Sequence, residues 1–239
     1  MGQRSQIYVR FTDKENKKYL IARYFGWNYS ERMVSRAKHS LEWIKEMIQY
    51  PHVFTSEQIR LIRILEVNFD MGDVAITSDI IEEWNEYSPE ENFSDYVFKW
   101  VDNNDGKLFI DIDENTMNIK YCFTDSDISK PLTAAQYMQW NHKQWRNSKY
   151  ISKEQKALCE KNIRQIPRLA KLMTMEELTD FINCDYGYKS HKTPVDYKQP
   201  IYLIYNNDDF IDVVDYEYKA KEQCSKINAN GGCGYYLVQ

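Results

Sequence analysis

The 239-residue sequence predicts a single α+β domain in which antiparallel β-hairpins pack against several α-helices. Three observations predict this class. Short segments alternate apolar and polar residues and are joined by turn-forming residues, as hairpins require. Elsewhere, apolar residues recur at helical spacing behind capping residues. Aromatic residues are abundant, with 19 tyrosines against 8 glycines and 6 prolines, which indicates a packed core. One domain over 1–239 is expected, with a subdivision into 1–130 and 131–239 as the alternative.

The predicted strands form three groups along the chain. The first hairpin joins residues 6–11 to residues 18–25 through a charged turn. A central hairpin is followed by a strand at 118–124, where the segment NIKYCFT alternates in polarity. Every strand pair is expected to be antiparallel because short turns, rather than helices, join the segments. The C-terminal strands are expected at 201–205, 210–214 and 235–238.

The central stretch VFKWVDNNDGKLFIDIDE, residues 97–114, resembles a calcium-binding loop. Such a loop needs carboxylates at positions 1 and 12 when glycine occupies position 6. With Gly106 at that position, Val101 and Ile112 stand where the carboxylates are required, so the register fails. We predict instead that Gly106 lies in the turn of a β-hairpin, with alternating strands on both sides.

Helices are expected where a capping residue precedes an apolar stripe. Asn28, with Glu31 three residues further on, predicts a helix that ends before Pro51. Pro167 lacks an amide hydrogen and is expected to break or kink the helix that contains it. Further helices are expected to begin near Thr55, Ser78, Thr133, Ser152, Thr174 and Glu217.

Charge is distributed unevenly along a chain whose formal net charge is -5. Acids dominate residues 70–114, and bases dominate residues 143–171. Carboxylates spaced along a rigid helix can imitate a phosphate backbone and occupy a basic groove of another protein. A solvated helix face would give the same pattern. The candidate partner-binding acids are Asp79, Glu82, Glu83, Glu86, Glu90 and Glu91.

The basic segment interleaves its lysines and arginines with Trp140, Trp145 and Tyr150. This combination lets a protein follow phosphates and stack on bases. Amphipathic helices with solvated lysines and buried tryptophans would produce the same string, so both interpretations stay open. The candidate nucleic-acid-binding residues are Lys149, Lys153, Lys156, Lys161 and Arg164.

Local motifs for catalysis and metal binding are missing from the sequence. It contains no G-x-S-x-G, no G-x-G-x-x-G and no phosphate loop, and its 4 histidines lack ligand spacing. The 5 cysteines share no C-x-x-C pair and predict neither a disulfide framework nor a zinc site. Cys233 lies in a glycine-rich stretch that is typical of a turn. We assign no catalytic residue, metal ligand or cofactor.

No segment combines the features of a secretion signal, and none approaches the roughly 20 apolar residues of a membrane span. We therefore expect a cytoplasmic protein without a membrane partner. The sequence leaves its oligomeric state open.

Two stretches near the start carry a resemblance. The segments GQRSQIYVR, residues 2–10, and LIARYFGWNYSERMVSRA, residues 20–37, resemble the opening of a family of bacterial and phage-associated proteins. The resemblance implies mobile-element biology and no particular activity. Arg32 and Arg36 lie one helical turn apart within it, which makes them a candidate anion clamp; pairing with Glu31 and other acids is the alternative.

These observations rank three hypotheses. The leading one is a non-enzymatic, phage- or mobile-element-encoded protein whose acidic surface engages the basic groove of a nucleic-acid-handling protein, as an inhibitor would. The second is a nucleic-acid-binding protein that uses residues 143–171. The third is an enzyme whose site assembles from residues far apart in the sequence.

Overall fold

The chain contains both helices and strands, so the expected α+β class is confirmed. It divides into two compact units: unit 1 comprises Met1–Lys45 and Val67–Pro194, and unit 2 comprises Glu46–Glu66 and Val195–Gln239. The expected single domain is therefore not confirmed, and the alternative boundary at residue 130 falls inside unit 1. The computed structural model describes residues 4–48, 77–100, 105–187, 202–207, 209–214 and 217–238.

Unit 1 is built on a 6-stranded sheet with strand order β3-β2-β1-β4-β5-β6. Strands β1 and β4 run parallel, as do β5 and β6, and the remaining neighbours are antiparallel. The expectation of purely antiparallel pairing is wrong because the chain passes through helices between β2 and β4 and again between β5 and β6. The strands span Arg4–Thr12 (β1), Lys18–Gly26 (β2), Thr77–Asp79 (β3), Lys107–Asp113 (β4), Asn118–Thr124 (β5) and Lys171–Leu172 (β6).

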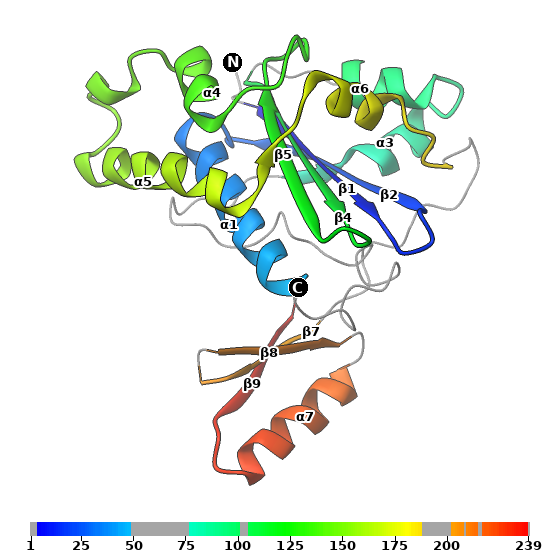
Figure 1. Ribbon diagram of the computed structural model, residues 1–239, viewed down its shortest axis with the longest axis vertical. Coiled ribbons are helices and arrows are strands. Elements are labelled where there is room, and N and C mark those ends of the chain that lie inside the picture. The colour runs from blue at the N-terminus through cyan, green and yellow to red at the C-terminus, as the bar shows by residue number, and fades with distance from the viewer. Residues whose placement is uncertain are drawn as a thin grey trace. The chain divides into compact units, whose positions relative to one another are not determined.

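Helices cover both faces of this sheet. Figure 1 shows α1, α4 and α5 on one face and α3 and α6 on the other. The α-helices span Glu31–Met47 (α1), Ile80–Tyr87 (α3), Ala134–Asn141 (α4), Lys153–Leu169 (α5) and Met175–Asn183 (α6). A π-helix, η2, spans Asp95–Trp100, and a 3-10 helix, η3, spans Trp145–Asn147.

Side chains of β1 point alternately to the two faces of the sheet and contribute to the core on each face. Ile7 and Val9 are buried on the face that α1 covers, and Tyr8 is buried on the opposite face. The Tyr8 ring stacks on Phe109 at a centroid distance of 4.9 Å, and Phe109 meets Phe181 of α6 edge-on at 5.3 Å. The sheet is therefore buried on both sides, as a mixed sheet between two helical layers should be.

The predicted central hairpin is wrong in its first half. Residues 95–100 form the π-helix η2, in which Val97 and Phe98 are both fully buried, whereas a half-buried strand would bury only one of two neighbours. Two side chains satisfy carbonyls of η2. The Tyr8 hydroxyl donates to the Val97 carbonyl at 2.6 Å, and the Lys107 ammonium donates to the Phe98 carbonyl at 2.7 Å. Burial lowers the pKa of Lys107 to about 8.

Gly106 does adopt the left-handed backbone expected of a turn glycine, with φ of 86°. A Cβ atom at this position would lie 2.4 Å from the Thr124 carbonyl oxygen. The second half of the predicted hairpin, Leu108–Ile112, lies within β4, and β4 pairs with β1 and β5. The sequence therefore predicted the turn glycine and the strand at 118–124 correctly, whereas the strand expected over residues 96–100 is wrong.

Three predicted helix starts are confirmed as complete capping boxes. Thr133, Ser152 and Thr174 each accept a hydrogen bond from the third helical residue, whose side chain accepts one in return. Asn28 is different: α1 begins at Glu31, and Asn28 turns its side chain inward instead of capping. Pro167 does not end α5, which continues to Leu169.

In the part of unit 2 that the structure describes, a small antiparallel sheet in the order β8-β7-β9 packs with the helix α7. Ala220 and Cys224 of this helix pack against Ile204 of the central strand. The predicted C-terminal strands and helix are confirmed, whereas the helix predicted near Thr55 lies outside the described residues. The elements are Tyr202–Asn206 (β7), Asp209–Val214 (β8), Glu217–Ala229 (α7) and Gly234–Val238 (β9).

Within the described parts of the chain, no helix combines the length and apolar character needed to cross a membrane.

Candidate functional site

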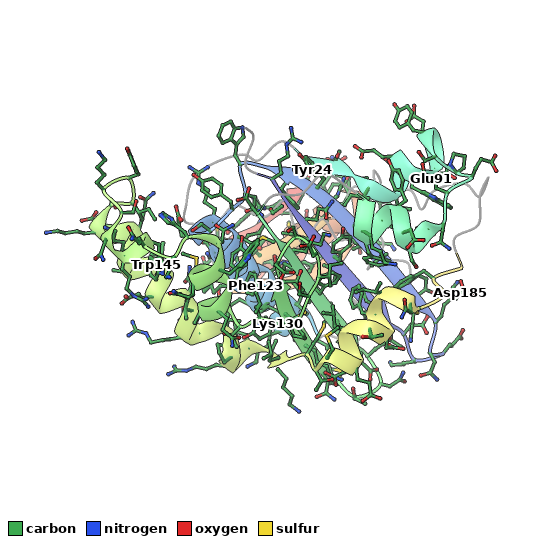
Figure 2. All side chains as sticks on the ribbon, turned by 90° about the horizontal axis from the view of Figure 1, so that it is seen from above. Tyr24, Glu91, Phe123, Lys130, Trp145 and Asp185 are labelled. Atoms are coloured by element: carbon green, nitrogen blue, oxygen red, sulfur yellow. The ribbon has the colours of Figure 1, made fainter. Side chains whose placement is uncertain are left out.

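The two helical layers of unit 1 carry opposite charge. The basic side consists of residues 143–171, whose helix α5 lies on the same face of the sheet as α1, and the acidic side consists of α3 with its cap Asp79, residues 88–95 and α6 on the other face. Trp145 and Glu91 label these opposite ends in Figure 2. The bases of the basic side are Lys143, Arg146, Lys149, Lys153, Lys156, Lys161, Arg164, Arg168 and Lys171, against Glu154 and Glu160.

Helix α5 presents its bases on one side by simple helix geometry. Its buried residues are Cys159, Asn162 and Ile166. Because each residue turns the helix by about 100°, four of the five basic residues of α5 fall within about 80° of one another, opposite this buried stripe. They are Lys153, Lys161, Arg164 and Arg168, and all are exposed.

Two cations of the basic side instead hold its own structure together. Arg146 pairs with Glu160 at 2.9 Å and lies over the buried Trp145 ring at 4.6 Å. The Lys156 ammonium donates to the Ser148 carbonyl at 2.6 Å, which anchors the segment before α5. The other cations of this side form no ion pair with any acid in the described residues.

Two aromatic rings within or just before the basic segment are exposed. Tyr150 is 85% exposed and Trp140 is 41% exposed. The Lys149 ammonium sits 5.1 Å from the centre of the Tyr150 ring. Trp145, the third aromatic residue of the predicted site, is buried and belongs to the core. The surface thus offers unpaired cations and two π-faces, which are the groups that bind phosphates and stack on bases.

Long-range hydrogen bonds fix α4, and with it Trp140, to the sheet. The Tyr137 hydroxyl donates to the Asp105 carbonyl at 2.7 Å, and the Asn141 amide donates to the Asp105 carboxylate at 3.2 Å. The same carboxylate accepts from the Arg4 amide at 2.7 Å. The sequence did not predict these contacts, because Arg4, Asp105 and Asn141 are far apart in the chain. The only local signal was Gly106, which predicted a turn next to Asp105.

The acidic side includes one predicted contact residue that the structure buries. Asp79 is 4% exposed and caps α3, accepting hydrogen bonds from the Ile81 and Glu82 amides at 2.9 and 3.1 Å. Burial raises its pKa to about 6, although the Arg23 guanidinium lies 3.8 Å away. Asp79 therefore serves the helix and is not available at the surface. Of the other predicted acids, Glu82 and Glu83 are half-buried, and Glu86, Glu90 and Glu91 are exposed.

Further acids on this side are committed to ion pairs. Arg10, which is 5% exposed, makes a two-pronged pair with Asp111 at 2.7 and 2.8 Å and reaches Asp180 of α6 at 2.7 Å. Partial burial opposes ionisation of Asp180, but Arg10 still holds its pKa below the ordinary value. Lys120 pairs with Glu177 at 2.9 Å and lowers the pKa of that carboxyl group.

The candidate clamp of Arg32 and Arg36 is divided between two environments. Arg36 is 4% exposed, donates to the Asn28 amide oxygen at 3.1 Å and lies over the Phe25 ring at 4.5 Å. Arg32 is half-buried and donates to the Trp27 carbonyl at 3.3 Å. Only Arg32 is therefore placed to meet a ligand at the surface.

Metal chemistry gains no local support. The described residues contain no group of three or more His, Cys, Asp or Glu side chains that could hold a metal ion. The chain matches no protein-family model, no curated protein and no solved structure. The charges and exposed rings described above therefore carry the functional argument.

Proposed function

We propose that the protein binds single-stranded nucleic acid in the cytoplasm through its basic side. One observation carries the proposal: the outward cations of α5 are exposed and have no acidic partner in the described residues, and the segment that leads into this helix exposes the ring of Tyr150, with Lys149 5.1 Å from its centre. Cations release counterions when they meet phosphates, and flat rings stack on any base. A surface with both groups suits a single strand, in which the bases are accessible.

The overall charge of -5 does not oppose this proposal. The acidic side faces away from the basic side across the sheet. Charges are screened over roughly 8 Å at physiological ionic strength, so a strand on the basic side meets mainly the local positive potential. We expect moderate, sequence-tolerant binding with a dissociation constant of roughly 10⁻⁴–10⁻⁶ M at physiological salt.

The test is fluorescence anisotropy with a labelled thymidine oligonucleotide and the matching duplex, at several salt concentrations. Reversal of Lys153, Lys161 and Arg164 to Glu should remove most of the binding to the single strand. Each lost phosphate contact should also make the plot of log affinity against log salt less steep, by about 0.7 per contact.

The matched control reverses the same number of exposed cations elsewhere. Lys99, Lys221 and Lys226 have side chains 60–69% exposed, and each pairs with a nearby acid. Their reversal to Glu changes the net charge equally and should leave most of the affinity intact. Equal losses in both triple variants, or wild-type binding that ignores salt, would show that the basic side is not the site.

Tyr150 separates stacking from electrostatics. Tyr150→Ala should weaken binding about tenfold without changing the salt dependence, because one stacked base contributes about 1–3 kcal/mol. Tyr87→Ala, which removes a 71% exposed ring from α3, is the control. Loss of affinity in the control alone would place the strand on the acidic side.

A second candidate function uses the acidic side against a basic protein. Its support is the exposure of Glu86, Glu90 and Glu91 in one short stretch that also exposes Tyr87, whose pKa a hydrogen bond to Glu86 raises. Neutralising the exposed Glu86, Glu90 and Glu91 to Gln should slow association with a basic partner isolated from host lysate, mainly at low salt. An unchanged association rate would leave this surface without a role.

A further inference from the structure

Two exposed tryptophans, Trp27 and Trp140, lie at one end of the sheet of unit 1. Trp27 directly follows Gly26, the last residue of β2. Trp140 belongs to α4, and its ring packs on Gly106, the residue before β4, where a Cβ atom would lie 3.0 Å from Cζ3 of the indole. Trp27 is 54% exposed and Trp140 is 41% exposed. Both side chains therefore reach solvent at the end of the sheet where β2 ends and β4 begins.

The sheet topology brings these two positions close together. Strands β2 and β4 are the two neighbours of β1. Gly26 pairs with Arg4, and Lys107, the first residue of β4, pairs with Gln6. Because neighbouring strands lie about 4.8 Å apart, the backbones at Gly26 and Gly106 are separated by roughly 10 Å.

Direct contacts join the turn that carries Trp27 to α4. The Ser30 amide, three residues after Trp27, donates to the Tyr137 hydroxyl at 3.3 Å. Tyr137 precedes Trp140 by one helical turn, and the centres of their rings are 6.0 Å apart. Figure 1 shows α4 on the same face of the sheet as α1, the helix that this turn leads into. The two tryptophans consequently belong to one connected surface of unit 1.

The backbone at Trp27 has a conformation that a bulky residue rarely adopts. Its φ is 62°, in the left-handed region, and Ser30 has a φ of 51°. Surrounding contacts hold the turn: the Arg32 guanidinium donates to the Trp27 carbonyl at 3.3 Å, and the Asn28 amide donates to the Ser5 hydroxyl at 2.9 Å. Glycine would suit this backbone better, and packing alone does not explain a tryptophan that is more than half exposed. Strain kept at an exposed position supports a functional role for the side chain.

We infer that Trp27 and Trp140 form a two-ring platform that stacks on bases of a bound single strand. The inference rests on the proposed binding of single-stranded nucleic acid and adds a second contact region to it. Helix α4 ends at Asn141, and the basic side begins at Lys143. A strand can therefore pass from the cations to the platform. Successive nucleotides of a stacked strand are about 3.4 Å apart, so about three steps cover the roughly 10 Å between the two backbone positions.

Substitutions of the two rings test the platform. The measurement is fluorescence anisotropy with the same labelled thymidine oligonucleotide. Trp27→Gly and Trp140→Ala should each weaken binding about tenfold, because each variant loses one stacked base. The salt dependence should stay the same, because no charge is removed. Glycine fits the left-handed backbone at Trp27, so the first variant should stay folded.

Conservative variants and a control on the other face complete this test. Trp27→Phe and Trp140→Phe keep an aromatic ring and should retain most of the affinity. Tyr87→Ala, which removes a 71% exposed ring from α3, should bind as the wild type does. An equal loss in Tyr87→Ala, or the same loss in the Phe and the non-aromatic variants, would overturn the platform.

The outcomes separate the platform from the proposed function. If the triple reversal on α5 removes binding and both tryptophan variants bind as tightly as the wild type, the platform is wrong and the basic side remains the site. If the tryptophan variants lose affinity and the α5 reversal does not, the platform binds the strand and the basic side does not. A wild-type protein that binds no oligonucleotide would overturn both.

A second measurement covers the case in which a tryptophan variant fails to fold. Wild-type protein is irradiated with a thymidine oligonucleotide in which iodouracil replaces some of the thymines, a base that crosslinks to aromatic rings in contact with it. Mass spectrometry of the digested product should place crosslinks at Trp27 and Trp140. Crosslinks confined to Tyr150 would overturn the platform while leaving the basic side as the site.

Discussion

The basic and acidic sides of unit 1 carry charge at similar density in the sequence, but they use it differently. On the basic side, Arg146 and Lys156 serve local structure, and the cations on the outer side of α5 are exposed and unpaired within the described residues. On the acidic side, Asp79 caps a helix, and Asp180 and Glu177 are tied to strands of the sheet. The two sides look alike when charges are counted in the sequence. Their contacts differ, because more of the acids than of the bases are held in caps and ion pairs.

The difference has a physical origin in the side chains. A carboxylate on a short stem accepts hydrogen bonds from backbone amides and is favoured at helix starts, so acids are readily drawn into the fold. Lysine and arginine carry their charge on long stems and keep it in water even when the stem packs. An acid-rich segment is therefore a weaker sign of a partner surface than a base-rich one of equal length.

The largest expected effect tests whether acids on this face of the sheet stabilise the fold through buried ion pairs. Asp111→Ala leaves the guanidinium of the buried Arg10 without its two-pronged partner. Removal of one member of a buried ion pair costs about 3–5 kcal/mol, so urea unfolding should show a loss of that size. The control, Asp95→Ala, breaks the exposed pair with Lys99 and should cost less than about 1 kcal/mol. Similar losses of stability in the two variants would show that the buried ion pair stabilises the fold no more than the exposed one.

The second prediction concerns the pH dependence of Asp79. Its pKa in the folded protein is about 6, above the value of 3.8 for an unperturbed aspartate. The folded state therefore holds this proton more tightly than the unfolded state, and stability falls as pH rises from about 4 to about 6. Asp79→Asn keeps a capping oxygen and removes the buried charge.

Asp79→Asn should consequently match the wild type near pH 4 and be more stable at pH 7, by up to about 3 kcal/mol. Urea unfolding of both proteins across this pH range checks the prediction. A variant less stable than the wild type at pH 7 would show that attraction to Arg23 outweighs the cost of burial.

Helix capping provides a smaller test on the basic side. Ser152→Ala removes the side chain that accepts from the Gln155 amide at the start of α5. The expected cost is about 1 kcal/mol. Ser225→Ala, in which a helical serine bonds the Lys221 carbonyl, should change stability by less than about 0.5 kcal/mol. Equal effects would mean that α5 is held by packing alone and that its cap contributes nothing.

Sequence patterns predicted the local elements well. The capping boxes at Thr133, Ser152 and Thr174 need residues only three positions apart, and all three formed. Asn28 matched the same pattern and did not cap, because Ser5 of β1 and Arg36 of α1 both bind its side chain. The competing partners lie outside any short window of sequence.

The same dependence on long-range contacts explains why the predicted hairpin was wrong and why only some aromatic residues of the basic segment are exposed. Residues 95–100 alternate like a strand, but Tyr8 and Lys107 supply the donors that satisfy carbonyls of a π-helix instead. Exposure likewise depends on tertiary contacts: Tyr150 and Trp145 are both aromatic residues of the basic segment, and only the first is exposed. Local spacing predicts an element, whereas long-range contacts decide its partners.

The smallest effect compares two single lysines, one from each face. Lys161 is exposed and unpaired among the described residues, so Lys161→Gln should leave stability within about 0.3 kcal/mol of the wild type. Lys120 pairs with Glu177, its side chain is 30% exposed, and its hydrogen bond to Glu177 raises its pKa. Lys120→Gln should therefore cost roughly 0.5–1 kcal/mol in low salt. In 1 M salt, where screening acts over about 3 Å, this difference should shrink. Urea unfolding at both salt concentrations measures it. A larger loss of stability from Lys161→Gln than from Lys120→Gln would show that Lys161 supports the fold, and that the cations of α5 are not simply exposed charges.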